Sequence, residues 1–560
     1  MGHWAELSGL RSALAPILKG MNLNGSVSAR VWRDSAIGLA LPAILISVFV
    51  LAPFYNKAFT IDDPIFLHAA VQSIVNPAMP GAYDVVWDKD VPLRASAGSM
   101  VTGPIGGYLL VPSVLLGGSE PAAHLVAWLL LCCAAVATCS LALRLGYCRW
   151  RAAVAAALLV SAPAVLAMAS TNMPDLPAMA FGVMSAERYF AWKATGKSGA
   201  AIAATVLLTI AILTRSHMLL LIGVLAMPCL IRLLRRDGDE SGNPKWWWLP
   251  LAGAPVIAVL FLWVIRDPSP TAQANLAHLP PMFHFRQIPG NIVAFGLHWV
   301  LAFPLGIAWT WLHWRSIRGY LLAGLPLAFF VPLPPEVPRW AAVVATIGFL
   351  VIFDVFLLAL KKRDSIQFTL GLWLLMGVAT FPYVHHPAKY ELPAAPAAAI
   401  LIAGTLPAAN RRTLAGVAAV CATGIVLGAA IIHADAVLSG LGRQMAADVI
   451  RPAVAAGNRV WFAGHWGFQW YAEQAGARPI TEDAPWPIPG DLVLWSSADR
   501  CHALEYVPQR KLLRSWTFDD AGGRVMSGPD QAGFYSSGWG YLPWSWGSGT
   551  INHFELWKVE

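Results

Sequence analysis

Charged residues are scarce in this chain: Asp, Glu, Lys and Arg together make up 12% of its 560 residues. Soluble globular domains carry about 25% charged residues, so an ordinary soluble fold is excluded. The net charge of +8 is spread over short clusters between apolar runs. The sequence has no basic stretch with interleaved aromatic residues of the kind that binds nucleic acid. We therefore predict no nucleic-acid partner.

Cysteine is also rare. Most of the seven cysteines lie in apolar runs, and only Cys501 falls in the C-terminal region that begins near residue 434. This distribution excludes a disulfide within that region and a metal site built from spaced cysteines. The first apolar run begins near residue 35 and is long enough to span a membrane, so we predict no cleavable signal peptide.

Long apolar runs are what the chain has in abundance, and 57% of its residues are hydrophobic. A helix needs about 17 to 25 apolar residues to cross a bilayer core. The 26 tryptophans suit a protein with two membrane–water interfaces. The pattern predicts an α-helical polytopic membrane protein with about 13 transmembrane helices, at residues 35–54, 121–143, 152–169, 178–192, 200–214, 216–231, 247–265, 292–312, 320–333, 340–360, 366–384, 393–407 and 414–432.

The loops between these runs alternate in charge. One set is basic, with examples at Arg149, Lys193, Arg318 and Arg411, and the N-terminal segment 1–34 is basic as well. The opposite set is longer or acidic and comprises 58–120, 170–177, 266–291 and 385–392. Positive loops stay in the cytoplasm. The sequence thus predicts a cytoplasmic segment 1–34, a transmembrane domain 35–433 and a C-terminal tail outside.

The tail, residues 434–560, differs in composition from the rest. Short apolar stretches such as "RVWFAGHW" and "DLVLWSS" alternate with Gly and Pro, which is typical of strands separated by turns. We expect a small extracytoplasmic α/β domain.

The ionisable residues of interest all fall on the predicted outer side. They are Asp62, Asp63, Asp175, Arg215, His217, His284, Arg286, His385, His386, Lys389, Tyr390 and Glu391. Each has a simpler explanation. Adjacent acids at a helix end can be solvated, Asp175 can cap a turn, Arg215 can reach towards headgroups, and loop histidines can make ordinary hydrogen bonds. Taken together, however, ionisable groups at membrane depth tend to line a cavity or a substrate path.

These residue types suit chemistry on an amphiphile with a phosphorylated head. Arg215, Arg286 and Lys389 can hold a phosphate by charge-assisted hydrogen bonds, and a nearby carboxylate can take the proton of an acceptor hydroxyl. That pairing describes sugar transfer from a polyprenyl phosphate, with cations stabilising the leaving phosphate.

Several motifs resemble those of a known family, the GT-C superfamily glycosyltransferases related to protein O-mannosyltransferases and the lipid A aminoarabinose transferase. "FTIDDPIFLHAA" is similar to the acidic motif after span one, "NMPDLPAMAF" to a segment with one Asp, and "LTIAILTRSHMLLL" to a Thr-Lys-Gly pattern. "KYELPAAPAAAILIAG" resembles a basic-Tyr-x-x-Pro segment. In place of the charged residue that relatives often have before a Pro-Pro motif, this chain reads Val101-Thr102-Gly103-Pro104.

The resemblance implies roles for the matching positions. Asp62 or Asp63 is the expected general base, and the other would bind sugar, acceptor or metal. Asp175 would position the acceptor or sugar, and Tyr390 would hydrogen-bond the phosphate held by Arg215, Arg286 and Lys389. Because some relatives bind a metal, a divalent metal is a candidate cofactor, with His284 and an acid as candidate ligands.

The resulting hypothesis is an inverting, polyprenyl-phosphate-sugar-dependent glycosyltransferase of the bacterial inner membrane, active at the periplasmic face on a lipid, glycan or protein acceptor. The alternatives are a non-catalytic lipid-glycan-binding protein or subunit of a larger membrane assembly, and a secondary transporter. Against the transporter, the spans show no obvious internal repeat and the polar residues cluster at one interface.

Overall fold

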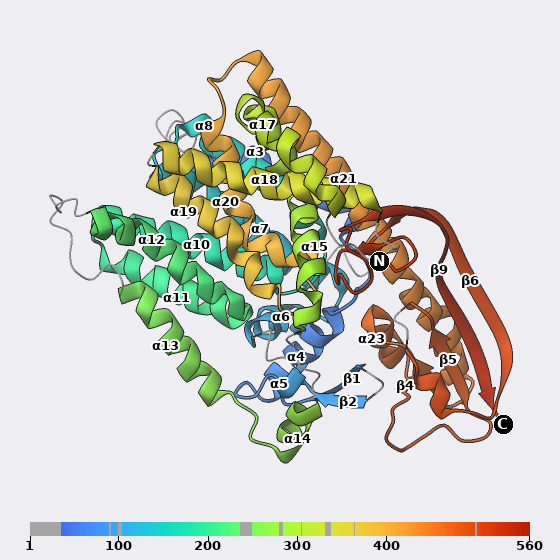
Figure 1. Ribbon diagram of the computed structural model, residues 1–560. Helices are drawn as coiled ribbons and strands as arrows, with labels where there is room; N and C mark the ends of the chain where they lie inside the picture. The colour runs from blue at the N-terminus through green and yellow to red at the C-terminus, as the bar shows by residue number, and fades with distance from the viewer. Residues whose placement is uncertain are drawn as a thin grey trace, which may run out of the picture.

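The helical part and the C-terminal sheet lie side by side in the chain's fold (Figure 1). This is a computed structural model, and it describes residues 35–88, 91–98, 103–235, 249–278, 284–303, 305–330, 338–362, 364–498 and 501–560. The predicted cytoplasmic segment 1–34 lies outside the described residues.

Helices make up most of the described chain. Those of its first half are α3 (Ala36–Leu51), η1 (Ala52–Phe54), α4 (Asp63–Val75), α5 (Ala95–Gly98), α6 (Ile105–Leu115), α7 (Glu120–Arg144), α8 (Arg149–Ser161), α9 (Pro163–Met168), α10 (Asp175–Thr195), α11 (Ser198–Thr214), η2 (Ser216–Leu219), α12 (Leu220–Arg235) and α13 (Leu249–Val264). Those of its second half are α14 (Pro270–His278), η3 (Phe285–Gln287), α15 (Ile288–Leu301), α16 (Leu305–Leu312), α17 (Trp314–Gly324), η4 (Leu325–Phe330), α18 (Arg339–Lys362), α19 (Ser365–Leu374), η5 (Leu375–Thr380), η6 (Ala388–Ala394), α20 (Ala395–Thr405), α21 (Arg411–Met445), η7 (Ala446–Ile450) and α22 (Arg451–Ala455).

Each of the predicted spans falls largely on one or two of these helices. Among the described residues, 4 helices are long and apolar enough to cross a membrane: Ala36–Phe54, Glu120–Arg144, Arg339–Lys362 and Arg411–Ala455. A fifth span would be the pair Phe285–Leu301 and Gly306–Leu312, which is bent by 63°. The protein is therefore a multi-pass membrane protein, and the predicted number of 13 spans stays a prediction.

Side chains at the helix ends and small residues between helices explain much of the local structure. Asp364 and Asn410 cap α19 and α21 by accepting backbone N–H groups of the first turn. Gly348 lets α18 approach α15 closely, because a Cβ at this position would lie 2.2 Å from the carbonyl oxygen of Gly296. Exposed apolar side chains such as Phe49, Leu322 and Phe330 face outwards from α3, α17 and η4, as expected for surfaces that meet lipid.

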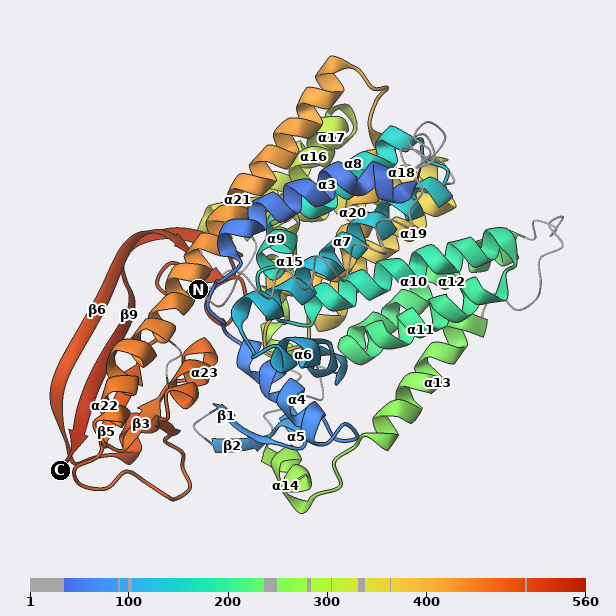
Figure 2. The ribbon, with the colours of Figure 1, turned by 180° about the vertical axis from the view of Figure 1, so that it is seen from behind.

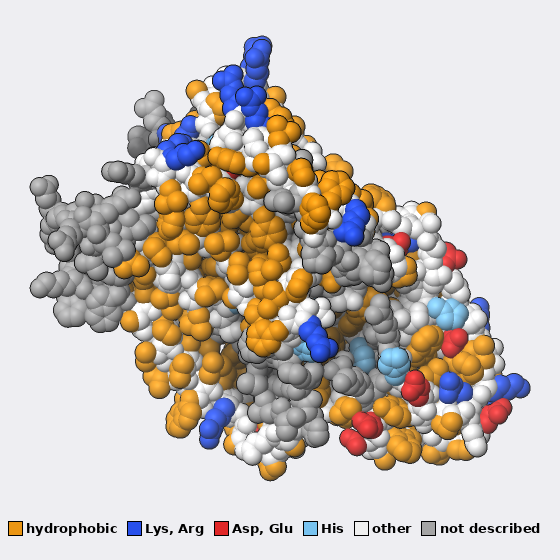
Figure 3. Space-filling view, in the orientation of Figure 1, with side chains coloured by type: hydrophobic (Ala, Val, Ile, Leu, Met, Phe, Trp, Pro, Cys, Tyr) orange, Lys and Arg blue, Asp and Glu red, His pale blue; other side chains and the backbone are white. Residues whose placement is uncertain are grey.

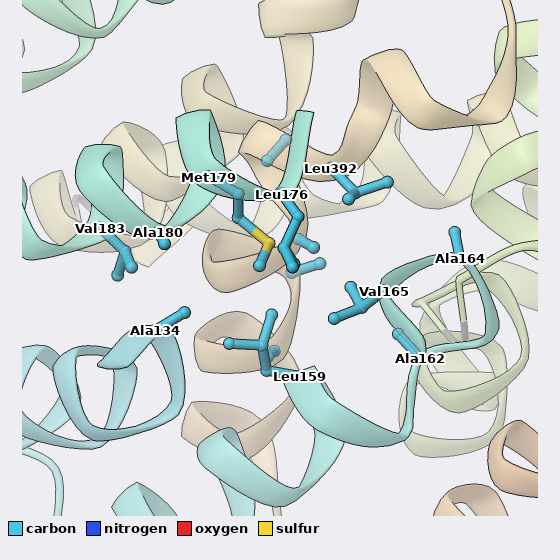
Figure 4. Close-up of a cluster of buried hydrophobic side chains, with 14 of the residues drawn as sticks. Ala134, Leu159, Ala162, Ala164, Val165, Leu176, Met179, Ala180, Val183 and Leu392 are labelled. Atoms are coloured by element: carbon cyan, nitrogen blue, oxygen red, sulfur yellow. The ribbon is translucent and has the colours of Figure 1, made fainter. Parts of the chain in front are cut away.

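The helical core lies directly beside the polar residues described below. Figure 4 shows Ala134 of α7, Leu159 of α8, Val165 of α9, Leu176 of α10 and Leu392 of η6 directed towards one another. All of these side chains are buried, with at most 1% exposure. The sequence neighbours of Leu176 and Leu392 are Asp175 and Glu391, so the same packing that forms the core fixes the backbone that carries these carboxylates.

The predicted first outer loop, 58–120, is folded. It contains α4, the antiparallel strands β1 (Asp84–Asp88) and β2 (Val91–Arg94), and the helices α5 and α6. Figure 2 shows α4 and α6 below the helical bundle, with the β1–β2 pair between α4 and the C-terminal sheet.

The C-terminal part is a mixed sheet with helices, as the alternation of strands and turns predicts. Its strand order is β4–β3–β5–β9–β6. The strands of this part are β3 (Val460–Ala463), β4 (Arg478–Pro479), β5 (Leu492–Ser496), β6 (Arg510–Arg524), β7 (Met526–Ser527), β8 (Ala532–Gly533) and β9 (Ser545–Val559), with α23 (Trp466–Gln474) between β3 and β4. β3 pairs in parallel with both β4 and β5, whereas β9 runs antiparallel to β5 and β6. The two predicted strand motifs form β3 and β5.

The predicted domain boundary near residue 434 falls within α21, which continues to Met445. The chain also returns to the helices after β6, because Val525, Phe534, Tyr535 and Trp544 pack in the same apolar cluster as the bundle core. Figure 3 shows hydrophobic side chains over much of the bundle surface and a mixture of acidic, basic and histidine side chains over the C-terminal sheet. The domain boundary stays a prediction, and residues of the C-terminal part pack in the apolar core of the helical part.

Candidate active site

Asp62 forms a buried ion pair with Lys389, 327 residues away in sequence. Lys389 Nζ donates to Asp62 Oδ2 at 2.8 Å. The Lys389 side chain is 5% exposed and that of Asp62 is 26% exposed, so Asp62 keeps access to a ligand. Burial favours a higher pKa for this carboxyl, but Lys389, Arg215 and His385 act in the opposite direction and the net pKa is lowered. Asp62 is therefore ionised at neutral pH.

Asp63 is adjacent in sequence but has a different environment. Its side chain is fully buried, and its two oxygens accept backbone N–H groups of Thr60 at 2.9 Å and Asn172 at 2.8 Å. The bond to Thr60 closes a turn around Ile61, whose φ of 37° is rare for a β-branched residue. Burial raises the pKa of Asp63 to about 7, although the Lys57 ammonium and the two backbone N–H groups act in the opposite direction. Asp63 holds the loop that presents Asp62.

A second buried ion pair joins Asp175 and Arg215. Arg215 Nη2 donates to Asp175 Oδ2 at 2.7 Å, and the two side chains are 4% and 0% exposed. Asp175 stands in the first turn of α10, where an acid is also favoured by the helix dipole. Arg215 follows α11 in an extended conformation. The guanidinium lies 5.6 Å from the ring centroid of Tyr390, which links this pair to η6.

Buried polar atoms without hydrogen-bond partners surround this pair. They belong to Asn172 (Nδ2 and Oδ1), Asp175 (Oδ1), Arg215 (Nε) and His217 (Nε2), and no described residue bonds to them. Buried polar groups normally have partners. Asn172 is close in sequence to Asp175, and His217 is close to Arg215. A ligand bound beside this ion pair would therefore have hydrogen-bond donors and acceptors available.

Residues 385–391 supply more polar groups to the same place. His385 lies between Tyr390, whose hydroxyl is 3.2 Å from Nε2, and Ser536, whose Oγ is 3.0 Å from Nδ1. Ser537 Oγ accepts the backbone N–H of His386 at 2.8 Å. The C-terminal part thus fixes the loop that carries Lys389 and Tyr390.

A buried network behind Asp62 and Asp63 was not found from the sequence. Asp435 of α21 accepts hydrogen bonds from Lys57 at 2.7 Å, from Thr60 at 2.8 Å and from Tyr535 at 2.7 Å. It connects the predicted first outer loop, α21 and the segment after β8. Lys57 and Thr60 each lie more than 370 residues before Asp435 in the chain, so no local sequence pattern indicates this network.

Three buried side chains form a group that can hold a metal ion. The ligand atoms of His298, His386 and Glu391 lie within 4.8 Å of one another. His386 Nε2 and Glu391 Oε1 are 2.6 Å apart, and His386 Nδ1 is 2.7 Å from Thr380 Oγ1. His298 Nδ1 and Glu391 Oε2 have no partner among the described residues, whereas both ring nitrogens of His386 have one.

Two predicted site residues do not join the cluster. Arg286 is exposed in η3, and His284 is half-buried just before it, with its backbone N–H bonded to the carbonyl oxygen of Pro382 at 2.6 Å. No described contact links either side chain to Asp62, Asp175 or Lys389. His284 is also not a member of the metal-type group, which uses His298 and His386 instead. The metal ligand predicted at His284 and the phosphate contact predicted at Arg286 stay predictions.

A cavity of about 540 Å³ adjoins the cluster. It is lined by α4, the loop before α5, the start of α6, the ends of α11 and α13, and the segment between α13 and α14. Phe66, Leu213 and Leu262 provide apolar wall, and Ser216 next to Arg215 provides a polar edge. Asp267, another lining residue, accepts a hydrogen bond from Arg94 Nε at 2.7 Å.

One comparison with known proteins bears directly on these residues. The profile of the family described as dolichyl-phosphate-mannose-protein mannosyltransferase matches residues 120–266. Residues 120–266 are therefore similar to a domain of this family. The matched segment runs from the start of α7 to the end of α13 and contains both Asp175 and Arg215.

Other comparisons are distant. Among curated proteins, no sequence matches the chain. ArnT from Cupriavidus metallidurans bound to undecaprenyl phosphate has 14% identity and a TM-score of 0.49, covering 86% of this chain and 97% of that chain. The archaeal oligosaccharyltransferase AglB from Archaeoglobus fulgidus has 12% identity and a TM-score of 0.49, covering 81% and 65%. The arabinofuranosyltransferase AftD from Mycobacteria has 13% identity and a TM-score of 0.39, covering 94% and 40%. The family assignment rests on residues 120–266.

Proposed function

We propose that the protein transfers a sugar from a polyprenyl-phosphate donor to an acceptor hydroxyl, with inversion, at the periplasmic face of a bacterial inner membrane. The family that matches residues 120–266 is named for a dolichyl-phosphate sugar donor, and dolichol is a polyprenol. The observation that carries the proposal is the Asp62–Lys389 pair beside the buried Asp175–Arg215 pair. Together they supply a carboxylate for proton transfer and two cations for a phosphate.

Asp62 is the proposed general base. It is ionised, and its side chain is partly exposed, whereas Asp63 is fully buried and has both oxygens on backbone N–H groups. The acceptor hydroxyl gives its proton to Asp62 as its oxygen forms a bond to the anomeric carbon. The bond from that carbon to the phosphate oxygen breaks, and the electron pair leaves with the phosphate. A single displacement of this kind inverts the anomeric centre.

Lys389 and Arg215 are proposed to bind the phosphate of the sugar donor. A Lys ammonium has three N–H donors and a guanidinium has five, so each can bind phosphate while keeping its carboxylate. The developing negative charge on the leaving phosphate makes these contacts stronger in the transition state. Tyr390, beside the Arg215 guanidinium, adds a hydroxyl donor.

Asp175 is proposed to position the substrates. Its Oδ2 holds Arg215, and its Oδ1 has no partner among the described residues and can accept a hydroxyl of the sugar or acceptor. The lipid tail of the sugar donor would occupy the cavity of about 540 Å³, because its wall is largely apolar and includes Ser216, the residue after Arg215. The buried group of His298, His386 and Glu391 would hold a divalent metal and organise the loop that carries Lys389.

The test separates the two adjacent carboxylates. In cells that lack the chromosomal copy, mass spectrometry of envelope lipids and glycans would compare the wild-type chain, Asp62→Asn and Asp63→Asn at matched amounts of membrane-inserted protein. We expect Asp62→Asn to lower product by about 10²- to 10⁴-fold, the range for loss of a general base. Lys197→Gln, an exposed change in the turn between α10 and α11, serves as the control.

Asp63→Asn should act on stability, because one of its two backbone contacts loses an acceptor. Its folded amount should fall, and the activity per folded molecule should exceed that of Asp62→Asn. Full product formation by Asp62→Asn would refute the assignment of the base. Absence of any new product with the wild-type chain would refute sugar transfer itself.

A further inference from the structure

A second cavity, of about 300 Å³, lies between α7, α10, α12 and α19. Arg144 and Lys193 line it with positive charge, and Ser365 and Thr369 add hydroxyl groups. Most of the remaining wall is apolar and includes Phe190 and Trp373. Its size is at the lower end of the range for small-molecule sites, about 300 to 1,000 Å³.

This cavity is at the opposite ends of the helices that build the candidate active site. Along α10, Lys193 is 18 residues beyond Asp175 (193 − 175), which corresponds to about 27 Å at 1.5 Å per residue. Along α7, Arg144 ends the helix whose first residue, Glu120, accepts a hydrogen bond from Tyr471 of the C-terminal part at 2.7 Å. Asp175 and this cavity therefore lie near opposite ends of α10.

Basic side chains gather around the cavity. Glu187 binds Arg144, Arg188 and Ser140 together, so one carboxylate neutralises part of the charge of two guanidinium groups. Lys193 adds a third cation, with Nζ 5.7 Å from the ring centroid of Tyr189. No acid is among the described residues that line the cavity.

The wall chemistry selects an amphiphilic anion. A soluble phosphate would satisfy Arg144 and Lys193 but leave the apolar wall around Phe190 and Trp373 without a partner. Basic pockets between transmembrane helices bind the head groups of anionic lipids. We propose that this cavity binds the phosphate head of an anionic phospholipid, with part of an acyl chain along the Phe190–Trp373 wall, in the leaflet opposite to the candidate active site.

The experiment measures lipid selectivity of the full-length protein. The chain is reconstituted in phosphatidylcholine nanodiscs with trace spin-labelled phosphatidylglycerol or spin-labelled phosphatidylcholine, and the protein-bound fraction of each label is read by electron paramagnetic resonance. We expect the wild-type chain to prefer the phosphatidylglycerol label. Lys193→Gln should lower that preference about fivefold, as expected for the loss of one cation near a lipid phosphate.

Two controls keep the result specific. Lys197→Gln removes an exposed cation four residues after Lys193 that does not line the cavity. It should leave the preference for the phosphatidylglycerol label unchanged. Arg144→Gln removes a lining cation and leaves Glu187 bonded to Arg188 and Ser140, so it tests the cavity if Lys193→Gln folds poorly. It should also lower the preference.

Three outcomes would overturn the proposal. If Lys193→Gln and Lys197→Gln lowered the preference for phosphatidylglycerol equally, the anionic lipid would be attracted by the basic surface in general and not by the cavity. A wild-type chain without preference for the anionic label would mean that no such site exists. Displacement of the label by millimolar glycerol 3-phosphate would mean that the cavity takes a soluble phosphate. None of these results depends on the proposed sugar transfer, because no sugar donor or acceptor is present.

Discussion

The two ends of α10 carry ion pairs of opposite character. Near its start, Asp175 and Arg215 are buried, and both keep polar atoms that bond to no described residue. Near its other end, Glu187 uses one oxygen for Arg144 and Ser140 and the other for Arg188, and both arginines are partly exposed. A saturated pair fixes the helix in place. A buried pair with unused donors and acceptors can itself bind a ligand, whereas at the other end of α10 both oxygens of Glu187 are already in use.

The comparison first predicts unequal losses of stability. Arg215→Met leaves Asp175 buried without its cation and should lower the free energy of unfolding by about 3–5 kcal/mol. Arg188→Met leaves Glu187 with Arg144 and Ser140. Because the Arg188 side chain is 42% exposed, the free energy of unfolding should fall by at most about 1 kcal/mol. Denaturant unfolding in detergent, followed by circular dichroism, measures both.

A double variant sharpens this result. Arg215→Met with Asp175→Leu removes both buried charges and should recover much of the stability lost by Arg215→Met alone. Similar losses for Arg215→Met and Arg188→Met would mean that burial does not separate the two ends of α10.

The second prediction concerns the buried group of His298, His386 and Glu391, where two ligand atoms have no partner among the described residues. We expect chelator-treated protein to bind one zinc ion and to gain about 2.7 kcal/mol of stability when free zinc is 100 times the dissociation constant. His298→Ala removes a ligand with an unpartnered Nδ1 and should abolish both effects. Elemental analysis and thermal unfolding provide the two readouts.

His433→Ala, at an exposed histidine of α21, is the matched control and should bind zinc as the wild-type chain does. Undiminished zinc in His298→Ala would show that the ion binds elsewhere.

The third and smallest effect is a shift in pH dependence. A base works only when unprotonated, so activity falls as the pH drops below the pKa of Asp62. In the wild-type chain that pKa is below its ordinary value of 3.8, because Lys389, Arg215 and His385 act against burial. Lys389→Met removes this cation while burial remains, so the pKa of Asp62 should rise and the acid limb of the residual activity should move to higher pH.

Arg286→Gln provides the comparison, because its exposed side chain has no described contact with Asp62. It should leave the acid limb in place whatever it does to the rate. An acid limb that does not move in Lys389→Met would mean that another group is the base.

Much of the candidate site could be predicted from the sequence. Asp62, Asp175, Arg215, Lys389 and Tyr390 were expected to converge on one face, and described contacts link Asp62 with Lys389 and Arg215 with both Asp175 and Tyr390. The sequence could indicate these positions because ionisable residues stand out in apolar surroundings and because loop charge predicts a side of the membrane for each. The roles assigned to these residues stay predictions.

Other parts of the site left no local signal. Asp435 and Tyr535 lie in a helix and a loop of unremarkable composition, yet they complete the network around Lys57. His298 stands inside an apolar run and meets His386 and Glu391 only through the packing of α15 against η6. Such contacts depend on how distant segments fold together.

The sequence alone determined that this is a multi-pass helical membrane protein with a C-terminal sheet, because helix length and strand alternation are properties of consecutive residues. Only the tertiary structure decided which charges meet. It buried Asp63 on two backbone N–H groups and left Asp62 partly exposed beside Lys389. Two identical side chains in adjacent positions differ in this way because solvent access and ion pairing are set by segments hundreds of residues away.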